Sequence, residues 1–163
     1  MHPEKAVQQL TRICVEAEKT LDYNEIFNEI RLSSPSSYGT AEACAASVVQ
    51  TCIDMSIGLI IVQTENGNAA RLMAKYRPAA KILACAFPSL VTRQLQPIRG
   101  VIAHQLGTEH EDKEDITSVM VAEAKKQKLC ATGSKVIVLQ ATNEEQYETS
   151  VMRIVTVEWM TIK

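Results

Sequence analysis

The chain has 163 residues, of which 46% are hydrophobic and 22% are charged, as in an ordinary soluble globular domain. A net charge of -2 and an aromatic fraction of 4% argue against a nucleic-acid-binding protein, which relies on basic patches and stacking rings. The longest apolar run, Ile57 to Val62, is far shorter than the roughly 20 residues that cross a membrane. Residues 1–5 lack the pattern of a secretory signal. The composition predicts a single domain, 1–163, with neither a nucleic-acid nor a membrane partner.

The five cysteines are widely spaced and include no Cys-x-x-Cys pair, a usage typical of a reducing compartment. They are Cys14, Cys44, Cys52, Cys85 and Cys130. Because Cys14 and Cys85 lie within apolar patterns, we expect them to pack as small apolar residues. A thiol nucleophile is the alternative.

Two histidines raise the question of a metal or catalytic site. His104 lies in the apolar stretch 101–106, and His110 lies in the acidic stretch 109–115. The carboxylates near His110 are crowded without the spacing of metal ligands, so we expect a solvated loop and no metal site. His104 is expected to pack within the core.

Helical periodicity dominates the first third of the chain. Residues 4–21 repeat apolar side chains at gaps of three and four, which predicts an amphipathic helix. The apolar positions are Val7, Leu10, Cys14, Ala17 and Leu21. A shorter helix is expected over 25–31 and a loop over 33–39. A third helix should begin at Thr40 as its N-cap, and its inner face should carry Cys44, Val48, Cys52 and Met55.

From residue 59 the pattern alternates between strands and helices. Strands are expected at 59–62, 82–86, 101–106, 136–139 and 151–159, with helices at 69–76, 90–96 and 116–128. Continuous apolar runs are typical of parallel strands covered on both faces. The connection 140–150 is too short for a usual helical crossover, so the last strand should run antiparallel. We predict an α/β three-layer sandwich: a mostly parallel five-stranded sheet, an antiparallel last edge strand, and helices on both faces.

The loop after the first strand is the first candidate binding site. It consists of Thr64, Glu65, Asn66, Gly67, Asn68 and Ala69. In such a sheet, ligands bind outside the carboxyl ends of strands where the strand order reverses. The N–H groups of the following helix favour an anion, and Gly67 permits close backbone approach. The alternative is an ordinary Asn-Gly turn, and no Walker or Gly-x-Gly-x-x-Gly motif is present. These residues alone indicate a small-molecule-binding or assembly domain.

Several motifs, taken in order, resemble the C-terminal domain of pyruvate kinase. The longest runs from Ile60 through Thr64 and Gly67 to Lys75-Tyr76-Arg77-Pro78. The other matching segments are Ile13 to Glu18, Glu42-Ala43, Arg93-Gln94-Leu95, Arg99-Gly100-Val101, Gly133, Val136 to Leu139, and Met152 to Val155. The resemblance spans nearly the whole chain.

The resemblance implies what this chain contributes to a larger enzyme. In that family, phosphate passes from phosphoenolpyruvate to ADP with magnesium and potassium, and the catalytic groups lie in a barrel and a lid domain upstream. The chain is therefore expected to be cytoplasmic, to lack catalytic residues and cofactors of its own, and to bind an effector. Self-association is implied through the last strand and the missing barrel. A stand-alone small-molecule-binding α/β domain is the alternative, and an unrecognised enzyme using Cys85 or His104 is a third possibility.

The effector loops depart from the resembled family. Where its sugar-bisphosphate-regulated members carry Ser, Thr and basic residues, this chain has Glu65, Asn68 and Ala69. The second loop, 142–148, contains Glu residues and no Lys or Arg. A carboxylate about 6 Å from a phosphate charge costs up to about 3 kcal/mol at an effective dielectric near 20. A small phosphorylated effector is possible, but fructose bisphosphate is expected to bind poorly.

The last strand is the second candidate site, because an apolar edge strand can pair with another chain. The resemblance implies a subunit interface there, formed by Val151, Arg153, Ile154, Val155 and Val157. Antiparallel pairing about a twofold axis would join two sheets into one. In the alternative, residues 159–163 fold back and cover the edge.

Overall fold

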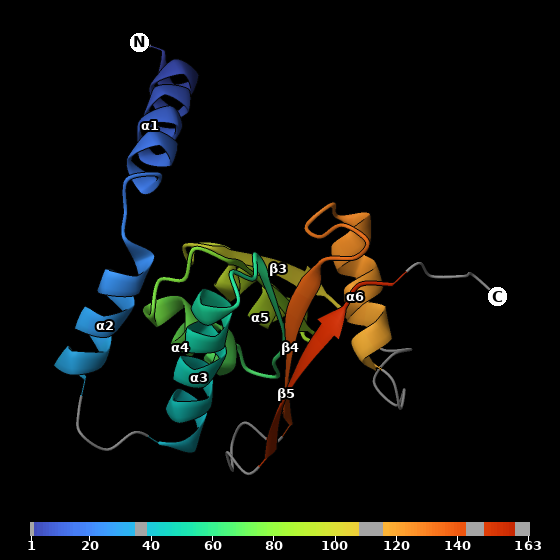
Figure 1. Ribbon diagram of the computed structural model, residues 1–163. Coiled ribbons are helices and arrows are strands. Elements are labelled where there is room, and N and C mark those ends of the chain that lie inside the picture. The colour runs from blue at the N-terminus through green and yellow to red at the C-terminus, as the bar shows by residue number, and fades with distance from the viewer. Residues whose placement is uncertain (1, 35–38, 108–115, 143–148, 159–163) are drawn as a thin grey trace.

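The computed structural model describes residues 2–34, 39–107, 116–142 and 149–158 (Figure 1). Its helices are α1 (Pro3–Glu18), α2 (Tyr23–Ser33), α3 (Thr40–Asp54), α4 (Asn68–Lys75), α5 (Ser89–Leu95) and α6 (Ile116–Lys126). Its strands are β1 (Leu59–Gln63), β2 (Lys81–Ala86), β3 (Val101–Gln105), β4 (Lys135–Thr142) and β5 (Thr149–Thr156). Each predicted helix and strand is present, with ends that differ by a few residues.

The five strands form one sheet in the order β3-β2-β1-β4-β5. The first four strands pair in parallel, and β5 pairs antiparallel with β4. The predicted fold class is therefore confirmed, including the antiparallel last edge strand. The chain builds outward from β1 to β3 on one side and then returns to add β4 and β5 on the other. The strand order thus reverses at β1, as required for a site at the end of that strand.

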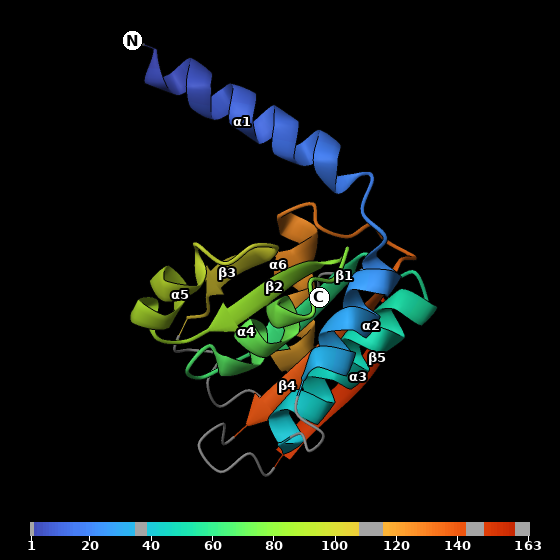
Figure 2. The ribbon, with the colours of Figure 1, turned by 90° about the vertical axis from the view of Figure 1, so that its left-hand side faces the viewer.

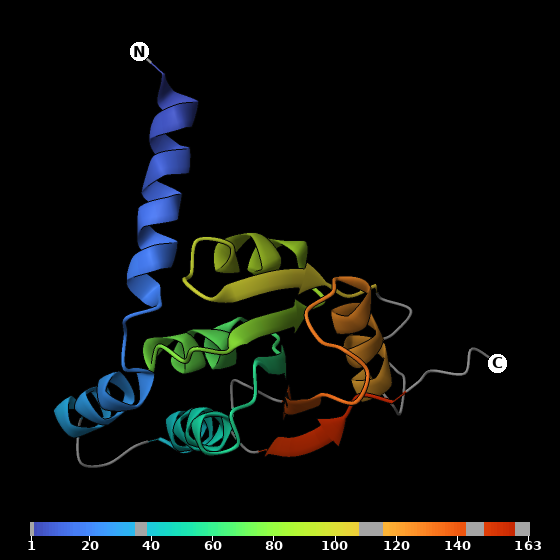
Figure 3. The same ribbon diagram turned by 45° about the horizontal axis from the view of Figure 1, so that its top comes forward.

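Successive residues of the central strands face opposite sides of the sheet, and each side has its own core. Ile60, Val62 and Ile82 belong to the core beneath α3, α4 and α5. Leu59 and Ile61 belong to the core beneath α6. Figure 3 shows α6 on the opposite side of the sheet from α3 and α4. Both faces are buried in the central part of β1, β2 and β4, which explains the continuous apolar runs of these strands, whereas the edge strand β3 is mostly half-buried.

Helix α1 projects away from the rest of the domain (Figures 1 and 2) and has no buried residue. Val7 and Leu10 are 63% and 62% exposed, and Cys14 is exposed. The expectation that Cys14 packs as a core residue is therefore wrong, because no other described element covers this face of α1. The same expectation is confirmed for Cys85, which is fully buried.

Local capping accounts for two differences at helix ends. The carboxylate of Asp22 accepts the N–H groups of Asn24 and Glu25 at 2.9 and 3.0 Å, so α2 begins earlier than predicted. The N-cap of α3 is Gly39, without a side-chain cap, and Thr40 is the first helical residue.

On the predicted inner face of α3, Val48 and Cys52 are buried, Cys44 is half-buried and Met55 is 39% exposed. Met55 lies outside the core because it is the C-cap residue, beyond the last helical turn.

Candidate functional site

The loop between β1 and α4 folds back on itself through Thr64. Its hydroxyl oxygen accepts the N–H of Gly67 at 3.0 Å, and its own N–H donates to the carbonyl of Cys85 on β2 at 3.0 Å. Thr64 is completely buried. Thr64 therefore stabilises the conformation of the loop from within the core.

The next residues set the start of α4. The side-chain oxygen of Asn66 accepts the N–H of Asn68 at 2.8 Å, as in an Asx turn. Gly67 is the N-cap with a φ of 84°, and its carbonyl accepts the N–H of Arg71 at 3.1 Å. A Cβ at Gly67 would lie 3.1 Å from a methyl carbon of Leu95, so glycine serves both the backbone conformation and the close approach of α5.

Burial divides the six loop residues. Thr64, Gly67 and Ala69 are buried, Asn68 is half-buried, and Glu65 and Asn66 are exposed. The exposed surface of the loop therefore carries a carboxylate and an amide. A ligand approaching from solvent would meet these two side chains before any other part of the loop.

One basic side chain near this loop was missed by the sequence reasoning. Arg71, in the first turn of α4, donates through Nη2 to the side-chain oxygen of Gln94 on α5 at 3.4 Å. The sequence signal was a cation two residues after the loop, but its direction could not be read without knowing that α5 lies beside α4.

The second candidate effector loop follows β4. Residues 143–148 lie outside the described residues, and so does His110. Because β1 and β4 are parallel neighbours with Gln63 opposite Gln140, their carboxyl ends meet at one edge of the sheet. The residues that follow both strands therefore start from the same edge.

The β5 edge forms the second candidate site. Val151 and Ile154 are 41% and 45% exposed, and Arg153 is also exposed. Val155 is half-buried, and Val157 is 1% exposed within the core beneath α6. The five predicted interface residues thus divide into three at the surface and two that mainly hold β5 against its own domain.

The backbone of β5 directs half of its polar groups away from β4. Val157 donates its N–H to Ser134 at 2.9 Å and accepts the N–H of Gly133 at 2.7 Å, so its polar groups point toward β4. In an antiparallel ladder this direction alternates from residue to residue. The N–H and carbonyl groups of Met152, Ile154 and Thr156 therefore point away from β4, along an edge that no other described strand pairs with.

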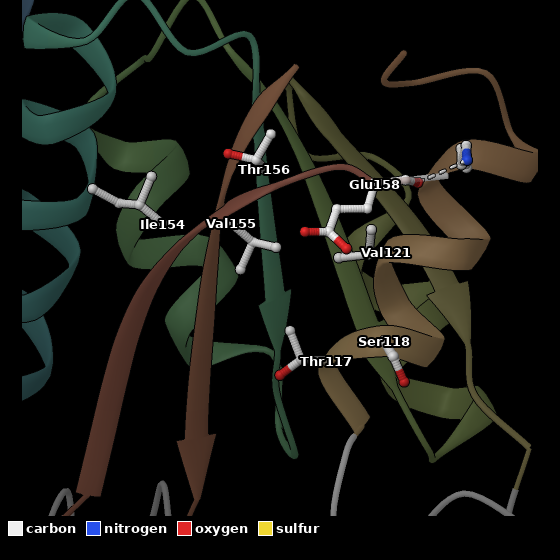
Figure 4. A pocket seen from close by; sticks show the side chains of 8 residues that line it. Thr117, Ser118, Val121, Ile154, Val155, Thr156 and Glu158 are labelled. Atoms are coloured by element: carbon white, nitrogen blue, oxygen red, sulfur yellow. Dashed lines mark hydrogen bonds between the residues drawn. The ribbon is translucent and has the colours of Figure 1, made fainter. Parts of the chain in front are cut away.

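A cavity of about 470 Å³ lies between α6 and this edge (Figure 4). It is lined by Thr117, Ser118, Val121 and Lys125 of α6 and by Ile154, Val155, Thr156 and Glu158 of the last strand and its extension. The ammonium of Lys125 donates to the backbone carbonyl of Glu158 at 3.1 Å. The hydroxyl oxygen of Thr117 is buried and has no hydrogen-bond partner among the residues that the structure describes. The cavity thus runs alongside β5, with α6 as its other wall.

Neither Cys85 nor His104 is arranged for nucleophilic catalysis. Burial raises the pKa of the Cys85 thiol to about 12, and the charge of Glu123 adds to this effect. His104 lies on β3, with Nδ1 3.2 Å from the amide nitrogen of Gln127 and 3.6 Å from a carboxylate oxygen of Glu123. The pKa of Glu123 is lowered, first by its hydrogen bond from Gln127. His104 is half-buried and holds α6 beside the edge of the sheet.

No set of three His, Cys, Asp or Glu side chains that could hold a metal ion occurs among the residues described by the structure. In the same part of the chain, no helix is both long and apolar enough to cross a membrane.

Residues 42–155 match the family model for the pyruvate kinase alpha/beta domain. The chain belongs to the pyruvate kinase family. It is 36% identical to the cytosolic pyruvate kinase isozyme of Glycine max in an alignment 157 positions long, which covers 85% of this chain and 30% of that protein. It is 35% identical to the pyruvate kinase of Dictyostelium discoideum, over 96% of this chain and 31% of that protein. The chain therefore spans about a third of the length of these relatives.

The fold is similar to that of a solved family member. Cryptosporidium parvum pyruvate kinase in complex with ADP superimposes with a TM-score of 0.84 at 35% sequence identity. The match covers 96% of this chain and 31% of that chain. Both α1 and the β5 edge therefore belong to a domain shared with a protein three times as long.

Two pyruvate kinase motifs identified in the sequence meet in the structure. The carboxylate of Glu42, in the first turn of α3, accepts hydrogen bonds from the ammonium of Lys75 and from the hydroxyl of Tyr76. Arg77 then turns the chain with a φ of 52°, immediately before Pro78. The Lys-Tyr-Arg-Pro motif thus ends α4 and fastens it to α3.

Proposed function

We propose that this chain is the regulatory and assembly domain of a cytoplasmic pyruvate kinase. The whole enzyme would transfer phosphate from phosphoenolpyruvate to ADP, giving pyruvate and ATP. The proposal is supported by the family match, by relatives named as cytosolic isozymes, and by the third of their length that the chain spans.

The chain by itself is proposed to be non-catalytic. The whole enzyme is expected to use magnesium and potassium, yet the described residues include no cluster of side chains suited to a metal ion. The buried thiol of Cys85 and the structural contacts of His104 also favour a role outside catalysis. A coupled assay of the purified chain with phosphoenolpyruvate, ADP, magnesium and potassium should show no turnover. Activity that copurifies with the chain and is free of host enzyme would overturn this assignment.

Assembly is supported chiefly by one observation, the open polar edge of β5 flanked by exposed apolar side chains. A second copy can supply both the missing hydrogen bonds and an apolar surface when two β5 strands pair antiparallel about a twofold axis. The exposed apolar face of α1 offers further surface to another domain of a longer protein or to another subunit.

The charge of Arg153 favours particular registers of this pairing. An axis through Arg153 would place two guanidinium groups opposite each other, which is unfavourable. An axis through Ile154 instead pairs Ile154 with its own copy and Arg153 with Val155. Ile154 also directs its polar backbone groups outward, so this register forms a hydrogen-bonded pair at the axis. We propose pairing centred on Ile154.

Light scattering of the wild type and of Ile154→Pro tests the proposed pairing. Proline removes the outward N–H and disrupts the edge, so the dimer should dissociate. Ile154→Thr is the matched control because it keeps the N–H and a β-branched side chain, so it should weaken dimerisation much less. Circular dichroism confirms that both variants fold. A wild type that stays monomeric at high micromolar concentration would reject pairing by the isolated chain.

The edge beyond β1 and β4 is the proposed position of an effector. Glu65 and Asn66 are the exposed side chains of the first loop, so the effector would be contacted there by a carboxylate and an amide. This pair suits hydroxyl or amine groups better than phosphates. Fructose bisphosphate is therefore an unfavourable candidate.

A further inference from the structure

The corner between α1 and α2 is held by Arg99, a residue far from it in the sequence. Arg99 Nε donates to a carboxylate oxygen of Glu18, the last residue of α1, at 2.9 Å. Arg99 Nη2 donates to the hydroxyl of Tyr23, the first residue of α2, at 3.4 Å. One guanidinium therefore contacts both sides of the corner.

Tyr23 closes the corner from within. Its hydroxyl donates to the backbone carbonyl of Glu18 at 3.2 Å. The guanidinium carbon of Arg99 lies 6.0 Å from the centre of the Tyr23 ring, within the range of a cation–π contact. Arg99, Glu18 and Tyr23 thus form a closed set of contacts, which we call the corner clamp.

The base of the clamp is fixed to the sheet. Arg99 lies in the turn between α5 and β3, directly before Gly100, whose φ is 78°. The carbonyl of Gly100 accepts the N–H of Ile82 on β2 at 2.8 Å. The side chain of Arg99 is 32% exposed, so the ion pair with Glu18 is partly shielded from water. The position of Arg99 is therefore set by the sheet itself.

The other end of the clamp is a helix with little else to orient it. None of the residues of α1 is buried. Figure 2 shows that α1 extends away from the body of the domain and is joined to α2 by a short turn. Residues 19–22, which connect α1 to α2, are exposed. Without a tertiary contact at this corner, α1 would be free to change direction about that short connection.

We infer that the corner clamp is a conformational device that fixes the direction of α1 relative to the sheet. Breaking the Arg99–Glu18 pair releases α1 to swing about residues 19–22 while the sheet and α2 stay folded. This property belongs to the chain itself and does not depend on the proposed function. In a longer protein, the clamp would set the orientation of α1, and of the residues that precede it, relative to the sheet.

Distance measurements between two spin labels test the clamp. One label is placed on α1 through Gln8→Cys and the other on α5 through Ser89→Cys, both exposed positions. Cys14, Cys44 and Cys130 are first replaced by serine, while Cys52 and Cys85 are buried and escape labelling. Dilution into unlabelled protein removes distances between copies. The wild type should give one narrow distribution.

Variants on both sides of the clamp should broaden that distribution. We expect its width to increase about twofold or more in Arg99→Gln and in Glu18→Gln, with no further increase in the double variant. Arg99→Lys should give a width between those of the wild type and Arg99→Gln, because one ammonium cannot reproduce both donors of the guanidinium. Glu16→Gln is the matched control, since Glu16 is exposed and its carboxylate pairs with the neighbouring Lys19 at 2.7 Å.

Circular dichroism and urea unfolding verify that each variant retains its helices and its cooperative core. A wild-type distribution that is already broad would overturn the inference. So would a width that is unchanged in both Arg99→Gln and Glu18→Gln, since folded variants would then orient α1 without the clamp.

Discussion

The hydroxyl of Tyr76 donates a hydrogen bond of 3.1 Å to the carboxylate of Glu42, joining the end of α4 to the first turn of α3. Tyr76 is completely buried, and its ring lies 5.4 Å from that of Phe27 on α2. Three helices on one face of the sheet therefore meet at this tyrosine.

Tyr76→Phe should destabilise the domain without changing its fold. The ring and its packing against Phe27 remain, but the bond to a charged acceptor is lost, which costs about 1.5–3 kcal/mol. Urea unfolding followed by circular dichroism measures the loss. Tyr38→Phe is a useful comparison because it makes the same chemical change in the loop predicted over 33–39. An unchanged midpoint for Tyr76→Phe would show that the hydrogen bond contributes nothing net.

Stability should fall in acid partly through Glu42. The hydrogen bond from Lys75 is the main reason that the pKa of Glu42 is lowered from 4.5, and the bond from Tyr76 acts in the same direction. A carboxyl whose pKa is lower in the folded state stabilises the protein above its unfolded pKa, and that contribution disappears as the pH falls through the folded pKa. The wild type should therefore have a larger free energy of unfolding than Glu42→Gln at pH 7, and this difference should shrink below about pH 4.5.

Urea titrations of both proteins at several pH values check this dependence. A difference between wild type and Glu42→Gln that stays constant into strong acid, or that grows there, would contradict the assigned role of Glu42.

Gly67→Ala should be destabilising by about 1–3 kcal/mol, because alanine at a φ of 84° is strained and its Cβ would crowd Leu95. Gly58→Ala is the matched control, since a Cβ there meets no atom within 4 Å. Thermal unfolding of the two variants should separate them clearly. Equal melting temperatures would mean that α4 and α5 can move apart at little cost.

Fructose 1,6-bisphosphate should bind weakly or not at all, because the exposed loop residues include Glu65 and the loop contains no cation. Titration calorimetry at neutral pH is the direct measurement. Glu65→Lys should strengthen any residual binding, and Glu65→Gln, which only removes the negative charge, should strengthen it less. A micromolar dissociation constant for the wild type would refute this interpretation of the loop.

Local patterns were sufficient for the fold because 59–62 of β1 and 82–86 of β2 are continuous apolar runs and polar turns separate them from the helices. The same patterns failed for α1. Val7, Leu10 and Cys14 have the spacing of a buried face, yet the face is exposed in the described part of the chain. Periodicity shows that a helix has an apolar side, but it does not show what covers that side.

The place of the loop 64–69 in the fold could be predicted from the sequence, but the orientation of its side chains could not. The position of 64–69 after a strand and before a helix followed from the alternation of patterns. The orientation of Thr64 could not be predicted in this way: its hydroxyl faces the loop's own backbone and accepts the N–H of Gly67. Polar residue types in a loop do not reveal whether their side chains face a ligand or the protein's own backbone.

From the sequence we could predict the order of helices and strands, the parallel core, the antiparallel last strand and the family, since these depend on local periodicity and on motifs. The folded domain was needed to show which distant residues meet: Glu42 with Tyr76, Arg71 with Gln94, and Arg99 with Glu18. Such pairs arise when packed elements bring together side chains separated by tens of residues. No local pattern of one segment specifies its partner in another, because that choice is made by the packing of the whole domain.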